Sequence, residues 1–419
     1  MATEQEKLSA SRWSLQANPW RTDLRILLIA AMIVFLITVA IGLLNGQRVV
    51  QLSQDVLLTH VHAGTIGWIT LSVFAISIWL FGGDSASQGN KLFIRWSSII
   101  AAASVPLYVL AFLSGNYIAR AIFGVPVLLV MIGFFSWVLV RSSKVRLGVA
   151  QLAILASLLT LVLGGLLGVL LQFQFATSSA FLPNGAFGAH PATMVAGYLV
   201  LIGMALSEKS LLPDTGKVSR LGMIQILLLF LAGLAIGIGI LFNITPLYAV
   251  NTLFQVVGAI IYIVRFAPSI ARLNWLGHNS ERFFAISAIF VVINIALTVY
   301  LTVSLIRGVF TADNIPSGLL IALDHSMFVG VMTNAIFGLI RSATEERRAI
   351  WPWAEDVLFW GMNIGVTGFI ITLLSGALVL ERVFTPIMGL SILLGLLVYA
   401  LRMRTPAVPA SAKARATVS

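Results

Sequence analysis

Apolar residues occur in this chain as long, nearly uninterrupted runs rather than in the alternating patterns of soluble domains. Each run reaches the roughly 17 residues that a helix needs to cross the hydrocarbon core of a bilayer. The pattern therefore predicts an all-α, polytopic membrane protein with twelve transmembrane helices. The predicted spans are 24–44, 58–82, 94–114, 118–140, 148–173, 189–206, 219–241, 244–266, 283–306, 317–340, 356–380 and 383–402.

The segments outside these runs predict no soluble domain. We expect residues 1–23 to be a cytoplasmic N-terminal segment and residues 24–402 to be the transmembrane domain. Residues 403–419, rich in Pro, Ala and Ser, are typical of a disordered cytoplasmic tail. The first run is long and follows a polar segment, which favours a retained helix over a cleaved signal peptide. Trp13 and Trp20 are expected at the membrane interface.

Basic residues are distributed unevenly between alternate loops. With a cytoplasmic N-terminus, 22 of the 26 Lys and Arg residues fall on the cytoplasmic side. The four exceptions are Arg48, Arg120, Arg307 and Arg382. The positive-inside rule therefore predicts a multi-pass protein of the cell inner membrane with both termini in the cytoplasm. The net charge of +11 follows from this topology, so we expect lipid rather than nucleic acid as a partner.

The amino-acid composition limits the metal ligands that this chain can supply. Hydrophobic residues make up 59% of the chain and charged residues 10%, whereas soluble domains carry about a quarter charged residues. The chain has no cysteine, which excludes disulfides and thiolate metal sites. Any metal ligand must therefore be a histidine, a methionine or a carboxylate.

Four of the five histidines fall at the outer ends of predicted spans. They are His60, His62, His190 and His325, whereas His278 falls in a basic cytoplasmic loop and is expected to be solvated. The four lie on the second, sixth and tenth spans. His62 and His190 are separated by 128 residues, and His190 and His325 by 135. This interval suggests three four-helix units around a pseudo-threefold axis.

Histidines inside a membrane are costly unless they are paired or coordinated, so these four are candidate metal ligands. His60 and His62 project about 200° apart on a regular helix and cannot bind the same ion. They form either two separate sites, or one site plus one interfacial histidine. Alternatively, His60 and His190 bond water in the headgroup region, and His325 makes a structural bond beside Asp324. Imidazole suits haem iron and copper equally.

The segment His60-Val-His-Ala-Gly-Thr-Ile-Gly-Trp68 resembles the His-x-His-x-Gly-x-x-Gly-Trp helix of the haem-copper oxidase subunit I superfamily. It is most similar to the C-type oxidases, the nitric oxide reductases and the NnrS-like proteins. The resemblance implies a pseudo-threefold bundle of twelve helices, both termini inside, with one or two b-type haems toward the outer face. It implies His60, His62 and His325 as haem ligands, with His62 and His325 as an axial pair, and His190 as a ligand of copper.

The chain lacks residues that this family uses to bind copper. The seventh predicted helix, 221–241, contains no histidine, although the family places a copper-binding pair there. The residue four positions after His190 is Met194 instead of the tyrosine of many oxidases, and the eighth helix lacks the family's lysine. Dioxygen reduction coupled to proton pumping is therefore not expected, and no catalytic residue is assigned.

Other polar and small residues inside the spans have alternative interpretations. Asp324 either pairs with Arg120, orients His325, or faces water. Asn334 and Asn363 are expected to join the tenth and eleventh helices. Glycines after the histidines indicate close helix packing or room for a macrocycle; they are Gly64, Gly67, Gly330 and Gly338.

The sequence favours a haem-binding membrane protein that acts in electron transfer, or in nitric oxide or dioxygen chemistry, at the outer face. Its expected protein partner is a cytochrome c-type or other respiratory subunit. The alternative is a secondary transporter or channel with an outward-facing site lined by histidines. A third hypothesis is an assembly subunit that binds no cofactor.

Overall fold

The computed structural model describes Trp13, Leu15 and residues 18–83, 87–213, 218–311 and 314–406. These residues form helices and connecting turns, with no β-strand among them. Twelve helices within them are long and apolar enough to cross a membrane, which confirms the predicted number. The rest of the predicted N-terminal segment, and the tail beyond residue 406, lie outside the described residues.

We number the spans 1 to 12 in chain order. Span 1 is α2 (Arg21–Gly46). Span 2 combines α3 (Gln54–His62), η1 (Ala63–Thr70) and α4 (Leu71–Phe81). Span 3 is α5 (Gln88–Leu113) and span 4 is α6 (Tyr117–Ser142). Span 5 is α7 (Val149–Thr177). Span 6 combines α8 (Ala186–Ala192), η2 (Thr193–Leu199) and α9 (Val200–Leu211). Span 7 is α10 (Arg220–Phe242) and span 8 is α11 (Pro246–Ala271).

Spans 9 to 12 complete the bundle. Span 9 is α12 (Glu281–Ile306), and span 10 combines α13 (Ser317–His325), η3 (Ser326–Thr333) and α14 (Asn334–Ala343). Span 11 combines α15 (Pro352–Asp356), η4 (Val357–Gly361) and α16 (Met362–Ser375). Span 12 combines η5 (Leu378–Leu380) and α17 (Glu381–Arg402). The segments η1 to η4 are π-helical, and η5 is a 3₁₀ turn.

Several helix ends differ from the predicted ones by five or six residues. Span 3 begins at Gln88, because the Ser87 hydroxyl accepts a bond from the Asn90 backbone N–H and starts the helix in a polar stretch. Span 11 ends at Ser375 because Gly376 adopts a left-handed conformation with φ of 71°. Hydropathy measures the apolar run, whereas capping sets the helix end.

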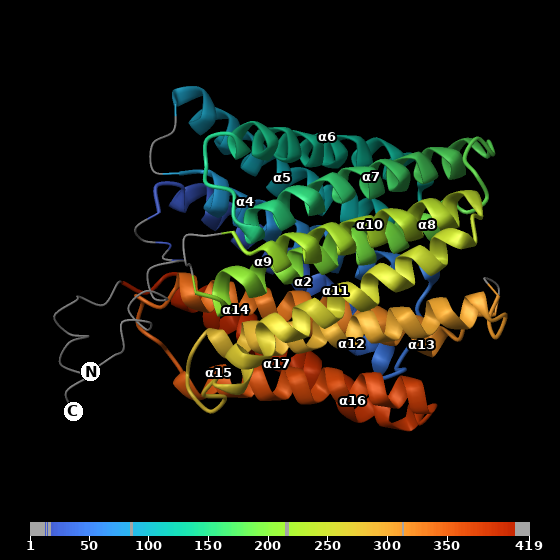
Figure 1. The fold of residues 1–419 in the computed structure, drawn as a ribbon. Helices are drawn as coiled ribbons and strands as arrows, with labels where there is room; N and C mark the ends of the chain where they lie inside the picture. Colours follow the sequence, from blue (N-terminus) through green and yellow to red (C-terminus); the bar gives the residue numbers. More distant parts are fainter. Residues whose placement is uncertain are drawn as a thin grey trace.

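The helices run side by side along the length of the molecule (Figure 1), and their contacts form a closed bundle. Span 4 packs on span 5 (α6 on α7) and span 8 packs on span 9 (α11 on α12). Span 12 returns to pack on span 1 (α17 on α2), which closes the bundle. The second spans of the three four-helix groups approach one another inside it, through contacts of η1 and η2 with η3.

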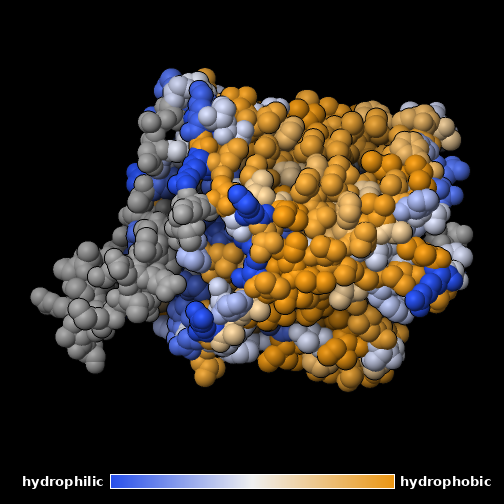
Figure 2. Space-filling model, viewed as in Figure 1, coloured by the Kyte–Doolittle hydropathy of each residue, from blue (hydrophilic) through white to orange (hydrophobic). Residues whose placement is uncertain are grey.

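The outer surface of the bundle is apolar. Figure 2 shows hydrophobic residues along the length of the helices and hydrophilic residues gathered at their two ends. Many large apolar side chains are exposed on this surface, including Ile33, Leu129 and Val264. Such a surface is stable only when hydrocarbon covers it, so the chain is a multi-pass membrane protein.

The first and last spans have their chain ends at the same end of the bundle. The Leu15 N–H donates to the Ala343 carbonyl at 3.2 Å, and the Arg347 guanidinium donates to the Met403 carbonyl at 2.8 Å. Both contacts tie chain-end residues to the loop that follows α14. An even number of spans requires this arrangement.

Two tryptophans predicted at the lipid interface are buried in protein instead. Trp13 packs edge-on against Trp79 with ring centroids 5.4 Å apart. The Trp20 indole N–H donates to the Gly83 carbonyl at 3.1 Å. Both rings are buried against other residues of the bundle, and the Trp20 indole also has a hydrogen-bond partner there.

At this end of the bundle, an arginine from each fourth span binds the terminus of the second span of its group. The contacts are Arg141 Nε to the Phe81 carbonyl at 2.9 Å, Arg265 Nη2 to Glu208 Oε1 at 2.6 Å, and Arg402 Nε to the Thr344 carbonyl at 3.1 Å. Arg141 and Arg402 satisfy free carbonyls at a helix C-terminus, whereas Arg265 forms an ion pair there.

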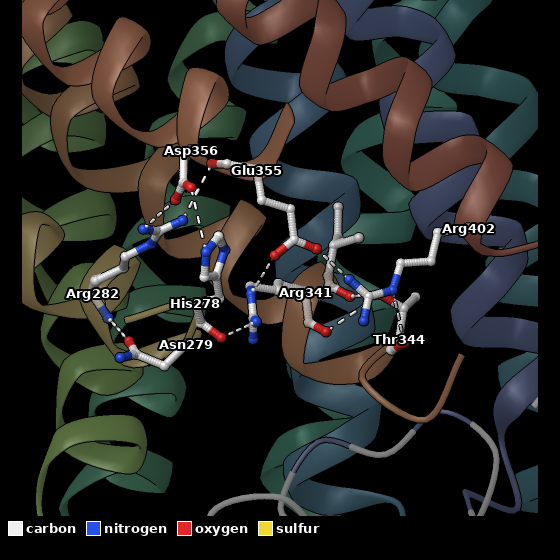
Figure 3. Close-up of polar contacts among 9 residues, drawn as sticks. His278, Asn279, Arg282, Arg341, Thr344, Glu355, Asp356 and Arg402 are labelled. Carbon is white, nitrogen blue, oxygen red and sulfur yellow. Dashed lines mark hydrogen bonds and ion pairs between the residues drawn. The ribbon is translucent and has the colours of Figure 1, made fainter. Parts of the chain in front are cut away.

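A buried ion-pair network joins spans 9 to 12 (Figure 3). The Glu355 carboxylate lies between the guanidinium groups of Arg341, at 2.9 Å, and Arg402. Asp356 binds Arg282 at 2.7 Å, and His278 Nε2 lies 3.5 Å from its second oxygen. The prediction that His278 is simply solvated is therefore incomplete, because its half-exposed ring belongs to this network.

We expect Glu355→Gln to lower the free energy of unfolding by about 3 kcal/mol, because it leaves two buried guanidinium groups without their shared carboxylate. Unfolding of the purified protein in a detergent titration measures this change. Glu281→Gln is the matched control, since Glu281 lies in the first turn of α12, where its loss costs at most about 1 kcal/mol. Equal effects of the two substitutions would contradict the assignment.

Candidate functional site

Four histidines lie at the end of the bundle opposite the chain ends. His60 and His62 are in α3, His190 is in α8 and His325 is the last residue of α13. His325 lies eight residues after the first residue of its span, which places it about 12 Å along the helix from that end. All four rings are partly accessible although they lie inside the bundle.

A π-helical segment follows the histidines in each of these three spans. Segments η1 and η3 begin directly after His62 and His325, and η2 begins three residues after His190. Such segments are rare and occur frequently at functional sites. Sequence reasoning did not predict them, because hydropathy does not distinguish a π-helix from an α-helix.

The π-helical segments are joined to one another by buried hydrogen bonds. The Trp68 indole of η1 donates to Thr333 Oγ1 of η3 at 3.1 Å, and the Tyr198 hydroxyl of η2 donates to Thr70 Oγ1 of η1 at 3.2 Å. Thr70, Tyr198 and Thr333 each follow a histidine by eight residues. The three histidine-bearing spans are thereby held together below the histidines.

His60 and His325 face each other. Their ring centroids are 6.3 Å apart and their planes differ by 24°. The two rings come from spans 2 and 10, which sequence reasoning also paired, but through His62. His62 instead stacks on Phe112 of α5 with centroids 3.7 Å apart. The structure therefore favours His60 over His62 as the partner of His325.

In each of the two facing rings, Nδ1 is hydrogen-bonded to a backbone carbonyl. His60 Nδ1 lies 2.8 Å from the Thr38 carbonyl, and His325 Nδ1 lies 2.9 Å from the Ile321 carbonyl. A carbonyl oxygen only accepts, so Nδ1 carries the hydrogen and Nε2 keeps a free lone pair. Within the described residues Nε2 of neither ring has a hydrogen-bond partner. Metal-binding histidines are oriented in this way.

Both rings line a cavity of about 510 Å³ between spans 1, 2, 10, 11 and 12. Its walls are mostly apolar and aromatic, with Phe35, Phe328 and Phe369 among them. Glycines widen it: a Cβ on Gly42 would lie 2.9 Å from the His60 ring. Volume and lining are typical of a site for one organic cofactor.

The outer end of the cavity is polar. Arg48 and Glu381 line it and form an ion pair at 3.0 Å, and Asp324 lines the cavity beside His325. Asp324 makes neither predicted interaction, because Arg120 pairs with Asp55 and His325 bonds its own helix. Asp324 therefore lines the cavity without either predicted partner, and the alternative in which it faces water stays a prediction.

The remaining two histidines lie on the other side of span 2. His62 Nδ1 is 2.7 Å from the Leu58 carbonyl, and His190 Nδ1 is 2.9 Å from the Gly164 carbonyl of α7. The four predicted histidines therefore do not form one group, because only His60 and His325 line the cavity.

No group of three or more His, Asp or Glu side chains within the described ranges could hold a metal ion. A larger hollow of about 720 Å³ lies beside the start of α2, lined by Arg21, Arg25 and Arg347. It contains no histidine and lies at the opposite end of the bundle. We therefore place the candidate site at the His60–His325 cavity.

Glycines and asparagines mainly fix helix packing, as the sequence indicated. Asn334 and Asn363 exchange two side-chain hydrogen bonds at 2.8 and 3.0 Å, which confirms the predicted link between spans 10 and 11. Gly67 and Gly330 are in close contact with Val34 and Phe290. The room for the imidazole comes instead from Gly42 on span 1, which no sequence pattern singled out.

No family model matches this chain, and no curated protein matches its sequence.

We expect Thr333→Val to lower the free energy of unfolding by about 1 kcal/mol, because the buried Trp68 indole loses its acceptor. Thr252→Val is the matched control, since the Thr252 hydroxyl bonds only the Tyr248 carbonyl of its own helix. Detergent-titrated unfolding of both variants measures the difference. An unchanged stability of Thr333→Val would contradict the bond between η1 and η3.

Proposed function

We propose that this protein binds a b-type haem between His60 and His325 and transfers electrons at the outer face of the membrane. The observation that carries the proposal is the pair of facing imidazoles, 6.3 Å apart between centroids, at a cavity in the bundle. The resemblance of His60–Trp68 to the haem-copper oxidase superfamily points to the same cofactor.

The separation of the rings fits one metal ion between them. An imidazole nitrogen binds a transition metal at about 2.0 Å and lies about 1.1 Å from its own ring centre, so opposite ligands have centroids about 6.2 Å apart. The two Nε2 atoms are the nitrogens left free by the carbonyl bonds. His60 and His325 would therefore each hold the metal through Nε2.

The number of ligands favours haem over a bare ion. Zinc and copper sites in proteins use three or four ligands, and the cavity supplies two imidazoles. A haem brings four equatorial nitrogens of its own. Two histidines are sufficient for this group, and the aromatic walls of the cavity suit a macrocycle.

Arg48 would bind the carboxylates of the haem. It lies at the polar outer end of the cavity in an ion pair with Glu381. Guanidinium groups bind carboxylates by charge-assisted, bidentate hydrogen bonds. The apolar ring would then occupy the inner part of the cavity, between Phe35, Phe328 and Phe369.

Ligation by two histidines favours electron transfer. Haem iron supplies one-electron chemistry, and two axial imidazoles leave it no open position for a gas. A site near the outer face could exchange electrons with a cytochrome c-type or other respiratory subunit. His190 has no neighbouring ligand pair from span 7, so nothing supports the copper centre of the oxidases.

Three further features support a pseudo-threefold arrangement of spans 1–4, 5–8 and 9–12. Each fourth span packs on the first span of the next group. Each second span combines a histidine with a following π-helix, and each receives an arginine from its fourth span. The basic residues support an orientation in the cell inner membrane with both termini in the cytoplasm.

We expect His60→Ala and His325→Ala each to abolish the haem of this site, because either change removes one axial ligand. The reduced-minus-oxidised spectrum of protein expressed with ample haem supply measures the loss. His278→Ala is the control, since His278 belongs to the ion-pair network at the other end. Wild-type protein without a b-type band would overturn the proposal and favour the transporter alternative.

We also expect carbon monoxide to leave the reduced spectrum of the wild-type protein unchanged, because both axial positions are taken. His325→Gly, supplied with imidazole to retain the haem, should bind carbon monoxide, because a free imidazole that is not tethered to the chain can be displaced by the gas. Absorption spectra with and without the gas provide the measurement. A full shift in the wild type would indicate an open axial position and gas chemistry instead.

A further inference from the structure

A hollow of about 720 Å³ beside the start of α2 lies at the end of the bundle opposite the proposed haem site. Arg21, Arg25, Ile29 and Ile33 line it at intervals of four residues, so they share one side of the helix. At 1.5 Å per residue, this stripe extends about 18 Å from the helix end toward the bilayer interior. The hollow therefore follows the first turns of span 1.

The chemistry of the hollow changes along this stripe. The two arginines lie in the first two turns of α2, at the end of the span. Ile29 is 42% exposed and Ile33 is 59% exposed, and both lie deeper in the span. A phospholipid has the same order, with a polar headgroup at the membrane surface and acyl chains in the hydrocarbon core. The lining thus matches the polarity of a lipid that lies along span 1.

A third guanidinium group reaches the hollow from a different part of the chain. Arg347 lies in the loop that follows α14 and lines the hollow together with the start of α2. Its Nη1 donates to the Met403 carbonyl at 2.8 Å and also to the Thr405 carbonyl. These bonds hold the side chain in place without cancelling its charge. Three positive charges therefore line the hollow.

The described lining of the hollow contains no carboxylate to balance these charges. Asp23 lies between Arg21 and Arg25 in the sequence, but it is buried and pairs with Arg95 of span 3 at 2.6 Å. In the ranges that the structure describes, the side chains of Arg21 and Arg25 have no hydrogen-bond or ion-pair partner. Partial burial, and then the charge of Arg25, lower the pKa of Arg347. Like charges around one hollow repel each other, and a bound anion relieves that repulsion.

We propose that this hollow binds an anionic phospholipid, with its phosphate among the three arginines and an acyl chain along Ile29 and Ile33. Guanidinium groups bind phosphate through charge-assisted, bidentate hydrogen bonds. Basic pockets between transmembrane helices bind anionic lipid headgroups. A free phosphate ion would satisfy the arginines but leave the apolar part of the hollow uncovered. No histidine lines this hollow, so binding of the lipid does not require the haem.

A lipid at this position would join segments that meet where the bundle closes. Span 12 packs on span 1, and Arg347 links the loop after span 10 to the residues after span 12. The Leu15 N–H bonds the Ala343 carbonyl at the end of α14. A phosphate shared between Arg25 and Arg347 would add a link from span 1 to both neighbours. We therefore expect the bound lipid to raise the unfolding temperature of the protein.

The test measures lipid binding to the full chain, purified and delipidated in detergent, by native mass spectrometry. Dioleoyl phosphatidylglycerol is the anionic probe, and dioleoyl phosphatidylcholine has the same acyl chains without a net charge. We expect phosphatidylglycerol to bind more tightly and to raise the unfolding temperature more than phosphatidylcholine does. Added salt should weaken its binding, because ions screen the attraction between exposed charges.

Arg25→Gln should weaken the binding of phosphatidylglycerol about fivefold, because it removes one of the three charges near the phosphate. Arg25→Lys should retain most of the affinity, since it keeps the charge. Arg272→Gln is the matched control, because Arg272 is an exposed C-cap residue of α11 at the same end of the bundle and does not line the hollow. Without lipid, we expect both glutamine variants to unfold at the wild-type temperature.

Equal binding of the two lipids would overturn the proposal, and so would phosphatidylglycerol binding that Arg25→Gln leaves unchanged. An equal loss in Arg272→Gln would show general attraction to a basic surface instead of a site in the hollow. Inorganic phosphate that competes with phosphatidylglycerol at equal affinity would assign the arginines to a soluble anion. Each of these outcomes would leave the haem proposal intact, because the haem is measured by its own spectrum.

Discussion

The hydrogen bond from a histidine Nδ1–H to a backbone carbonyl holds each of the four histidines at the end of the bundle opposite the chain ends. Water is absent from the hydrocarbon region, so a ring there must find its partner within the chain. Each of the four outer histidines has such a bond, at 2.7 to 2.9 Å. Because the bond uses Nδ1, it leaves Nε2 of each ring available for another partner.

Close packing makes these bonds possible. His60 reaches a carbonyl of span 1 because Gly42 leaves space for its ring, and His190 reaches span 5 because of Gly168. The π-helical segments that follow join the three spans through Trp68, Thr333 and their counterparts. In the proposed electron-transfer function, this frame would limit the reorganisation that accompanies a change of charge at the haem.

The two ends of the bundle differ in how their polar residues are arranged. The end that carries the four histidines combines a cavity of about 510 Å³ with single ion pairs. The opposite end is held by arginines on helix termini and by the network around Glu355. Buried ion pairs of this kind contribute less to net stability than to fixing one arrangement of the helices. The anchored end therefore suits a structural role, and the open end suits a cofactor.

The sequence by itself determined the twelve spans, the chemistry available in them and the end at which the histidines lie. Hydropathy follows from composition, and depth follows from the rise of a helix, so neither depends on how helices pack. It also predicted the Asn334–Asn363 link, because two amides on adjacent spans need partners in a membrane.

Only the tertiary structure decided which histidines face each other. The choice between His60 and His62 depends on the rotation of span 2 against spans 3 and 10, and on a glycine of span 1. The π-helical turns are set by bonds between spans as much as by local sequence. Pairing across helices is a property of their packing, and a linear pattern of apolar residues contains too little information to fix it.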